Sequence, residues 1–216
     1  MAEAVSGAES LVGALPPLQR LALAYAPAAA REPTLALLVL DQRLAGIVRN
    51  SHEPSLAQLR LAWWREQLQI DAAQWPRGEP LLALLKSWNG GHHAAVELVD
   101  GWEYLTGPAP LPAADLLAFA NGRGAAFAGL ARVLGADPAP ALQLGRQWAL
   151  ADLAAHVAHP EEQEKARSLL AMEGKPPRVA RALRPLTVLH GLAAKGRDGQ
   201  TPAALLTALR LGLLGR

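Results

Sequence analysis

Acidic side chains that could bind a metal ion are thinly spread along this 216-residue chain. Two carboxylates four residues apart on a helix share a face and can together hold Mg²⁺. The seven aspartates are never closer than 15 residues to each other, so the chain contains no such aspartate pair. Asp152 is the most distinctive acid, because it lies among leucine and alanine residues, where a lone carboxylate needs a cation or hydrogen-bond donors.

A second group of polar residues has the spacing of one helix face. His93 precedes Glu97 by four positions, and Asp100 and Glu103 follow at intervals of three. Side chains at these intervals are neighbours on a helix. His93, Glu97 and Asp100 are therefore candidates for a weak metal or effector site. The alternatives are a solvated surface face and a packing role for the step from Asp100 to Gly101.

Several classes of function are excluded by what the chain lacks. It has no cysteine, so disulfides, thiolate metal sites and cysteine nucleophiles are absent. No P-loop, HExxH motif or Ser-His-Asp spacing occurs. The six Trp, two Tyr and two Phe are not interleaved with basic residues, so we expect no nucleic-acid binding.

The composition predicts that helices position these residues. Alanine (45) and leucine (41) dominate, and both favour helices over strands. Proline and glycine divide the chain into apolar-periodic blocks of helical length. We expect a single all-α domain over residues 1–216, a bundle of about ten helices. The predicted ranges are 8–24, 34–49, 55–71, 80–89, 92–106, 113–134, 139–158, 161–171, 179–195 and 202–214.

Two of these ranges make specific packing predictions. The helix over 55–71 has two apolar stripes, one with Leu56, Leu59 and Trp63, so we expect it to be sandwiched between other helices. The small residues around Gly122 and Gly124 would either let two helices approach closely or line a cavity.

Three segments carry a resemblance to a known family. The first is Ser51-His52-Glu53-Pro54 followed by Gln58-Leu59-Arg60-Leu61-Ala62-Trp63-Trp64-Arg65. The second is Val99-Asp100-Gly101-Trp102, and the third runs from Leu144-Gly145 through Asp152 to His156-Val157. Together they resemble the squalene/phytoene synthase family, and most closely its divergent bacterial and mitochondrial branch. The resemblance covers about residues 18–157 and implies an isoprenoid synthase fold, here shortened at its C-terminus.

The family's chemistry is head-to-head condensation of prenyl diphosphates, for which aspartate pairs on facing helices hold Mg²⁺. This chain departs from that pattern. Where the first aspartate-rich motif belongs it reads Ala45-Gly46-Ile47-Val48-Arg49, with neither acid present. In the second motif only Asp152 remains, and the next turn offers His156. Asp152, His156 and Arg49 therefore stand at family motif positions without forming a metal cage.

Two functions remain open at this stage. The first is a catalytically degenerate family member, a pseudoenzyme, that binds an apolar or isoprenoid ligand or a protein partner. The relatives implicated in respiratory complex I assembly are its nearest analogue. The second is an active Mg²⁺-dependent prenyltransferase of isoprenoid biosynthesis with relocated metal ligands. We expect no cofactor under the first function and Mg²⁺ under the second.

The resemblance also implies a cavity within the bundle. Small residues would leave the walls of this cavity apolar where the family presents polar groups. These small residues are Ala45, Gly46, Ala149 and Ala155. We expect Asp152 to pair with Arg49 or Arg60 across the cavity. The predicted lining residues are Ala45, Gly46, Arg49, Arg60, Trp64, Gly122, Ala149 and Asp152.

Charge is unevenly distributed along the chain. Residues 1–164 carry 11 basic and 17 acidic side chains, whereas residues 165–216 carry 10 basic and two acidic ones, a net charge of +8. This basic end either is solvated while its leucines cap the core, or makes peripheral contact with an anionic membrane or acidic partner. No apolar run is long enough to cross a bilayer and no secretory signal pattern is present, so we expect a cytoplasmic protein.

Overall fold

The computed structural model describes residues 10–51, 53–195 and 201–215, and these are helical with no β-strand. The predicted all-α class is therefore confirmed. Residues 10–14 are helical. The longer α-helices are α2 (Pro17–Leu23), α3 (Ala28–Asn50), α4 (Pro54–Gln69), α5 (Pro80–Leu85), α6 (Val96–Glu103), α7 (Ala113–Val133), α8 (Pro138–His156), α9 (Pro160–Met172), α10 (Arg184–Ala193) and α11 (Pro202–Leu214). Short 3-10 segments adjoin them: η1 (Ala72–Gln74), η2 (Lys86–Trp88), η3 (Gly91–Ala95), η4 (Tyr104–Thr106) and η5 (Arg181–Leu183).

Prolines that separate the predicted helices mostly begin the next one. Pro54, Pro138 and Pro160 are each the first residue of their helix. This position suits proline, because its missing N–H has no partner there and its fixed φ is helical. Before α8, the Asp137 side chain also accepts a hydrogen bond of 3.0 Å from the Ala139 N–H.

One predicted break is wrong. The predicted range 34–49 places a break at Glu32-Pro33, but α3 begins at Ala28 and continues through Pro33. The proline ring crowds the carbonyl four residues earlier, which here belongs to Ala29 in the first turn. Only that end of the helix has to adapt. The range 92–106 differs in another way, because it divides into η3, α6 and η4.

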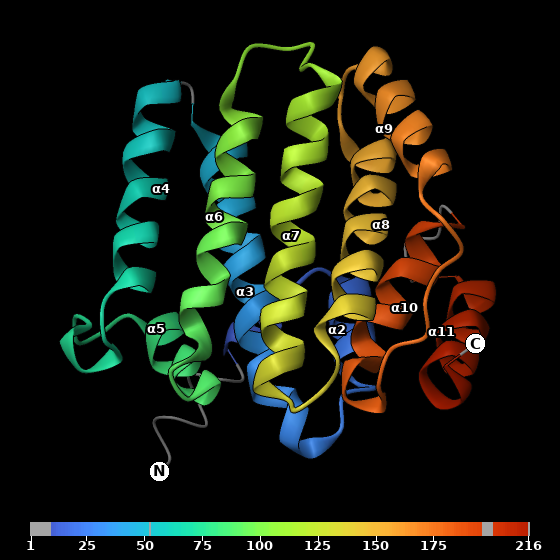
Figure 1. Cartoon of the computed structure of the whole chain (residues 1–216), viewed down its shortest axis with the longest axis horizontal. Coiled ribbons are helices and arrows are strands. Elements are labelled where there is room, and N and C mark those ends of the chain that lie inside the picture. Colours follow the sequence, from blue (N-terminus) through green and yellow to red (C-terminus); the bar gives the residue numbers. More distant parts are fainter. Residues whose placement is uncertain (1–9, 52, 196–200, 216) are drawn as a thin grey trace.

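The helices form two layers (Figure 1). Helices α4, α6, α7, α8 and α9 lie side by side in that order, and each of them contacts the next. Helix α3 lies behind them and packs on α4, α5, α6 and α7, while α10 packs on α8, α2 and α11. Within the described ranges no helix has the length and apolarity needed to cross a membrane.

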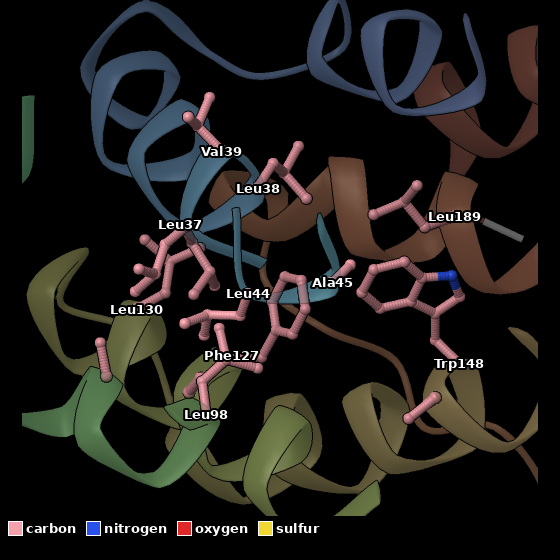
Figure 2. Packing of buried hydrophobic residues seen from close by; sticks show 14 of the residues in the cluster. Leu37, Leu38, Val39, Leu44, Ala45, Leu98, Phe127, Leu130, Trp148 and Leu189 are labelled. Carbon is pink, nitrogen blue, oxygen red and sulfur yellow. The ribbon is translucent and has the colours of Figure 1, made fainter. Parts of the chain in front are cut away.

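The core lies between α3 and the α6–α8 layer. Figure 2 shows Leu37 and Leu44 of α3 beside Leu98 of α6 and Phe127 of α7, with Trp148 of α8 nearby. The rings of Phe127 and Trp148 meet edge to face with centroids 5.6 Å apart. Large side chains from several helices thus pack together in the middle of the bundle.

The expectation that α4 is sandwiched is wrong. Helix α4 lies at the edge of the layer (Figure 1), and only one of its stripes, which includes Leu61 and Trp64, is buried. Leu56, Leu59 and Trp63 are exposed. Periodicity identifies both apolar stripes, but which of them is covered depends on neighbours that are distant in sequence.

Candidate functional site

A surface groove lies between residues 11–15, α3 and α4. Its volume is about 700 Å³, within the usual range for small-ligand sites. Its walls combine apolar side chains with arginines and two amides. The lining residues are Leu11, Ala14, Leu15, Val39, Gln42, Arg43, Gly46, Ile47, Arg49, Asn50, Arg60, Trp63 and Trp64.

The polar part of the groove is cationic. Arg43, Arg49 and Arg60 line it, and none of its lining residues is acidic. Arg43 lies 3.7 Å from the Glu79 carboxylate, whereas Arg49 and Arg60 form no ion pair with another described residue. Guanidinium groups bind carboxylates and phosphates through paired charge-assisted hydrogen bonds. The groove can therefore bind an anion.

The apolar part of the groove includes two tryptophans of α4. The rings of Trp63 and Trp64 meet edge to face, with centroids 4.9 Å apart and an interplanar angle of 84°. Trp64 is buried and Trp63 is partly exposed at the groove. Indole surface next to free arginines suits a molecule with an apolar body and an anionic end.

The predicted lining residues separate into two groups. Gly46, Arg49, Arg60 and Trp64 line the groove, whereas Ala45, Gly122, Ala149 and Asp152 do not. Half of the predicted lining residues therefore lie away from this groove. Ala45 and Ala149 are buried in the core, and Figure 2 shows Ala45 in the same packed region as Phe127 and Trp148. Successive helical residues point about 100° apart, so Ala45 faces the core while Gly46 faces the groove.

Gly122 serves a close helix crossing. A Cβ added to Gly122 would lie 2.9 Å from the Gly101 Cα, against the backbone of α6. On the other side of α7, a Cβ on Gly145 of α8 would lie 3.0 Å from the Gly124 Cα. Of the two interpretations of these small residues, close helix approach is confirmed.

A buried ionic centre occupies the opposite side of α3 from the groove. Arg123 of α7 lies between Asp41 of α3 and Asp152 of α8. Its Nη2 is 3.0 Å from Asp41 Oδ2, and its Nη1 donates to Asp152 Oδ2 at 2.8 Å. The side chains of Arg123 and Asp41 are each 3% exposed, and that of Asp152 is 31% exposed.

Aromatic side chains complete the surroundings of Arg123. The Trp102 indole N–H donates to Asp41 Oδ1 at 2.8 Å. The Arg123 Cζ lies 4.3 Å from the Trp148 ring centroid and 4.6 Å from that of Phe119. These ring faces attract the cation and also exclude water from it.

The pKa values of the acids differ because their surroundings differ. Burial raises the pKa of Asp41 above its ordinary value, more than Arg123 and the Trp102 hydrogen bond lower it. Burial also acts to raise the pKa of Asp152, but Arg123 and His156 outweigh it and bring this pKa to about 2. The hydrogen bond with Asp152 raises the pKa of His156, whose Nδ1 is 3.1 Å from Asp152 Oδ1.

The expected partner of Asp152 is wrong, although the acid does pair with an arginine. Arg49 and Arg60 line the groove, and the partner is Arg123. Sequence reasoning missed Arg123 entirely. The available signal was an arginine among glycine, alanine and phenylalanine in a helix without a polar face, which requires a buried acid elsewhere.

The residues at this centre do not fit Mg²⁺. Magnesium needs carboxylate oxygens that converge on an open, hydrated position. Here the oxygens of Asp41 and Asp152 converge on the guanidinium of Arg123, and Trp102 occupies a further lone pair. The guanidinium of Arg123 therefore supplies the positive charge of this centre.

The candidate metal ligands of η3 and α6 do not come together. Arg65 of α4 donates to Asp100 Oδ1 at 2.6 Å and also bonds Glu103. His93 Nδ1 lies 2.8 Å from the Leu68 carbonyl, and Glu97 is exposed. Among the residues that the structure describes, no three His, Asp or Glu side chains are grouped so that they could hold a metal ion. The acids of α6 instead join this helix to α4.

Comparison with known proteins adds no identification: no family model, no curated protein and no solved structure matches this chain.

Proposed function

We propose that this chain is a non-catalytic relative of the squalene/phytoene synthase family that binds an amphipathic ligand in the groove between α3 and α4. The ligand has an isoprenoid or similar apolar body and an anionic end. The observation that carries the proposal is the pair Arg49 and Arg60, which line the groove beside Trp63 without an ion-pair partner in the described chain.

The anionic end is supported by the charge of the groove. Three guanidinium groups line it, and among the described residues only Arg43 is near a carboxylate. A phosphate or diphosphate could bridge Arg49 on α3 and Arg60 on α4, since guanidinium geometry matches phosphate oxygens. The amides of Gln42 and Asn50, in the same lining, could supply further donors.

The apolar body is supported by the rest of the lining. Leu11, Val39 and Ile47 join the two tryptophans in the wall. Gly46 contributes no side chain, and a Cβ built there would meet no atom within 4 Å, so the groove has open space at this point. Contacts with aliphatic and indole surface favour a ligand with an apolar body.

The lack of catalysis is supported by the buried centre and by the sequence. Asp41 and Asp152 are committed to Arg123, and no aspartate pair replaces them. Without converging carboxylates, the described residues offer no group that would hold Mg²⁺ against a diphosphate and assist its departure. Family membership itself is supported by the motif resemblance at residues 51–65, 99–102 and 144–157.

Binding is tested by tryptophan fluorescence and calorimetric titration with farnesyl diphosphate, farnesol and inorganic pyrophosphate. We expect farnesyl diphosphate to bind more tightly than either part alone. The variant Arg49→Ala/Arg60→Ala should weaken farnesyl diphosphate binding by roughly tenfold or more and leave farnesol binding nearly unchanged. The matched control is Arg77→Ala/Arg132→Ala, which removes two exposed arginines that do not line the groove.

The same samples separate binding from prenyl transfer. Incubation with farnesyl diphosphate and Mg²⁺ should release no pyrophosphate and form no C30 product. Sustained Mg²⁺-dependent turnover would favour the active prenyltransferase. Equal loss of affinity in the groove variant and in the control would contradict the proposed site.

A further inference from the structure

Helix α11 is apolar on two opposite sides. Its inner side, with Ala204, Ala208 and Leu211, is buried against neighbouring helices. These neighbours are α10 and α2, and Figure 1 shows α11 at the edge of the molecule beyond α10. A Cβ on Gly212 would collide with the ring of Tyr25, so the helix is closely seated. The inner side alone accounts for its place in the fold.

The outer side of α11 is a leucine face without a partner in the described chain. Its side chains are between 48% and 69% exposed, although leucine is normally buried. They follow one another at intervals of one, three and four, which places them together, away from Ala204, Ala208 and Leu211. This outer leucine face consists of Leu205, Leu206, Leu209, Leu213 and Leu214.

Basic residues lie on α11 and at its end, and others belong to the same segment of the chain. Arg210 of α11 is exposed beside it and forms no ion pair with another described residue. The guanidinium of Arg184 lies against Gly215 at the end of α11. Arg178 and Arg181, which precede α10, are exposed as well. Arg197 and Arg216 lie outside the described residues but belong to the same +8 segment.

We propose that α11 docks the protein on an anionic lipid bilayer, with the outer leucine face inserted at the level of the headgroups and the arginines on the lipid phosphates. Helices that combine an apolar face with basic flanks bind in this way, parallel to the membrane surface. At 13 residues α11 is too short to cross the bilayer. The bilayer supplies both an apolar medium for leucine and negative charge for arginine.

Charge argues against a second copy of the chain as the occupant. An isologous dimer through the outer leucine face would bring two +8 segments together, and like charges at an interface are repulsive. Charge also distinguishes α11 from α4. Leu56 and Leu59 of α4 are exposed to the same extent, but they belong to residues 1–164, which carry 11 basic and 17 acidic side chains.

The experiment is flotation of the full chain with vesicles of phosphatidylcholine alone or with about one third phosphatidylglycerol, at low and high salt. We expect binding only to the anionic vesicles, weakened at high salt. The variant Leu206→Gln/Leu209→Gln should reduce the partition coefficient at least tenfold. Arg184→Gln/Arg210→Gln should reduce it by a similar factor at low salt and much less at high salt.

Matched controls use the same substitutions elsewhere. Leu56→Gln/Leu59→Gln removes two leucines whose exposures, 48% and 69%, equal those of Leu209 and Leu206. Arg77→Gln/Arg132→Gln removes the same charge from exposed sites. Both controls should bind like the parent protein. Arg49→Ala/Arg60→Ala should also keep vesicle binding, which separates this inference from the proposed ligand groove.

Three results would overturn the proposal. One is recovery of the parent protein in the soluble fraction with both vesicle types. Another is equal binding by the α11 leucine variant and its α4 control, with both melting like the parent. The third is light scattering that shows a dimer in the parent and a monomer in Leu206→Gln/Leu209→Gln, because a second copy would then cover the face. Loss of vesicle binding in the α11 variants alone would support the proposal.

Discussion

At the scale of single residues, two opposing effects determine how much the buried Arg123 contributes to stability. Removing its guanidinium and the Asp41 carboxylate from water costs several kcal/mol for each ion in general. Their contact at 3.0 Å, the Trp102 hydrogen bond and the facing aromatic rings offset that cost. The balance depends on all partners being present, so the removal of one is more damaging than the removal of the whole group.

Arg123→Met tests this balance. It leaves Asp41 buried without its cation, and we expect the free energy of unfolding to fall by about 3–5 kcal/mol in urea denaturation. The double variant Asp41→Leu/Arg123→Met removes both charges and should recover much of the loss. Arg132→Met, an exposed change on the same helix, should stay within about 0.5 kcal/mol of the parent. A single variant as stable as the parent would show that the ionic centre contributes nothing.

His156 makes stability depend on pH near neutrality. Its side chain is 76% exposed, and its pKa is raised by the hydrogen bond with Asp152. A raised folded-state pKa means that the stabilisation is complete below the ordinary value of 6.5 and is lost as pH rises through the folded value. The stability difference between parent and His156→Gln should therefore shrink from pH 6 to pH 9.

Urea denaturation at several pH values measures that difference. The pKa values of His92 and His190 are lowered by burial, so both histidines contribute a slope of opposite sign. They are present in both proteins and cancel in the comparison. NMR titration of the His156 ring gives the pKa directly, and a value at or below 6.5 would refute the raised pKa.

At the scale of helices, α7 is fixed by glycines on both sides. Gly122 meets α6 and Gly124 meets α8 at backbone distance. This closeness brings Arg123, which stands between the two glycines, within reach of Asp41 and Asp152. A side chain at either glycine would push the helices apart. The ionic centre depends on the short distance between them.

Two identical substitutions should have opposite effects for this reason. Gly122→Ala places a Cβ against the α6 backbone, and we expect a loss of about 2 kcal/mol or more. Gly46→Ala lies within helix α3, where an added Cβ meets nothing within 4 Å, so the lower backbone entropy of alanine should add about 0.5–1 kcal/mol. Thermal unfolding of both variants measures the effects. Equal signs would contradict the close crossing.

The helices could be predicted from sequence more readily than the site. Helix starts at Pro54, Pro138 and Pro160 follow from local chemistry, which a single sequence contains. The partner of Asp152 could not be predicted, because Arg123 reaches it only through the packing of α7 on α8. The groove escaped prediction for the same reason, since residues 11–15 complete its wall from outside the motif-bearing segments.

At the scale of the whole molecule, α3 separates two environments. One side, with Asp41, faces the closed core and the ionic centre, and the other, with Arg43 and Gly46, faces the groove. Ligand binding can therefore depend on exposed arginines without disturbing the buried charges. The proposed membrane face lies on another helix, α11, at the edge of the fold (Figure 1).

This separation predicts an unusual dependence on magnesium. In a Mg²⁺-dependent prenyltransferase the metal joins the protein carboxylates to the diphosphate, so it strengthens binding. Here arginines would bind the diphosphate directly, and Mg²⁺ would compete with them for the same oxygens.

We expect farnesyl diphosphate at about 100 times its dissociation constant to stabilise the fold by about 2.7 kcal/mol, which raises the melting temperature by at least about 5 °C. Added Mg²⁺ should reduce that shift, and Mg²⁺ alone should leave the melting temperature unchanged. Differential scanning calorimetry of the parent and of Arg49→Ala/Arg60→Ala measures both effects, with the variant expected to lose most of the ligand-induced shift. A shift that appears only when Mg²⁺ is present would mean that carboxylates, and not the groove arginines, hold the diphosphate.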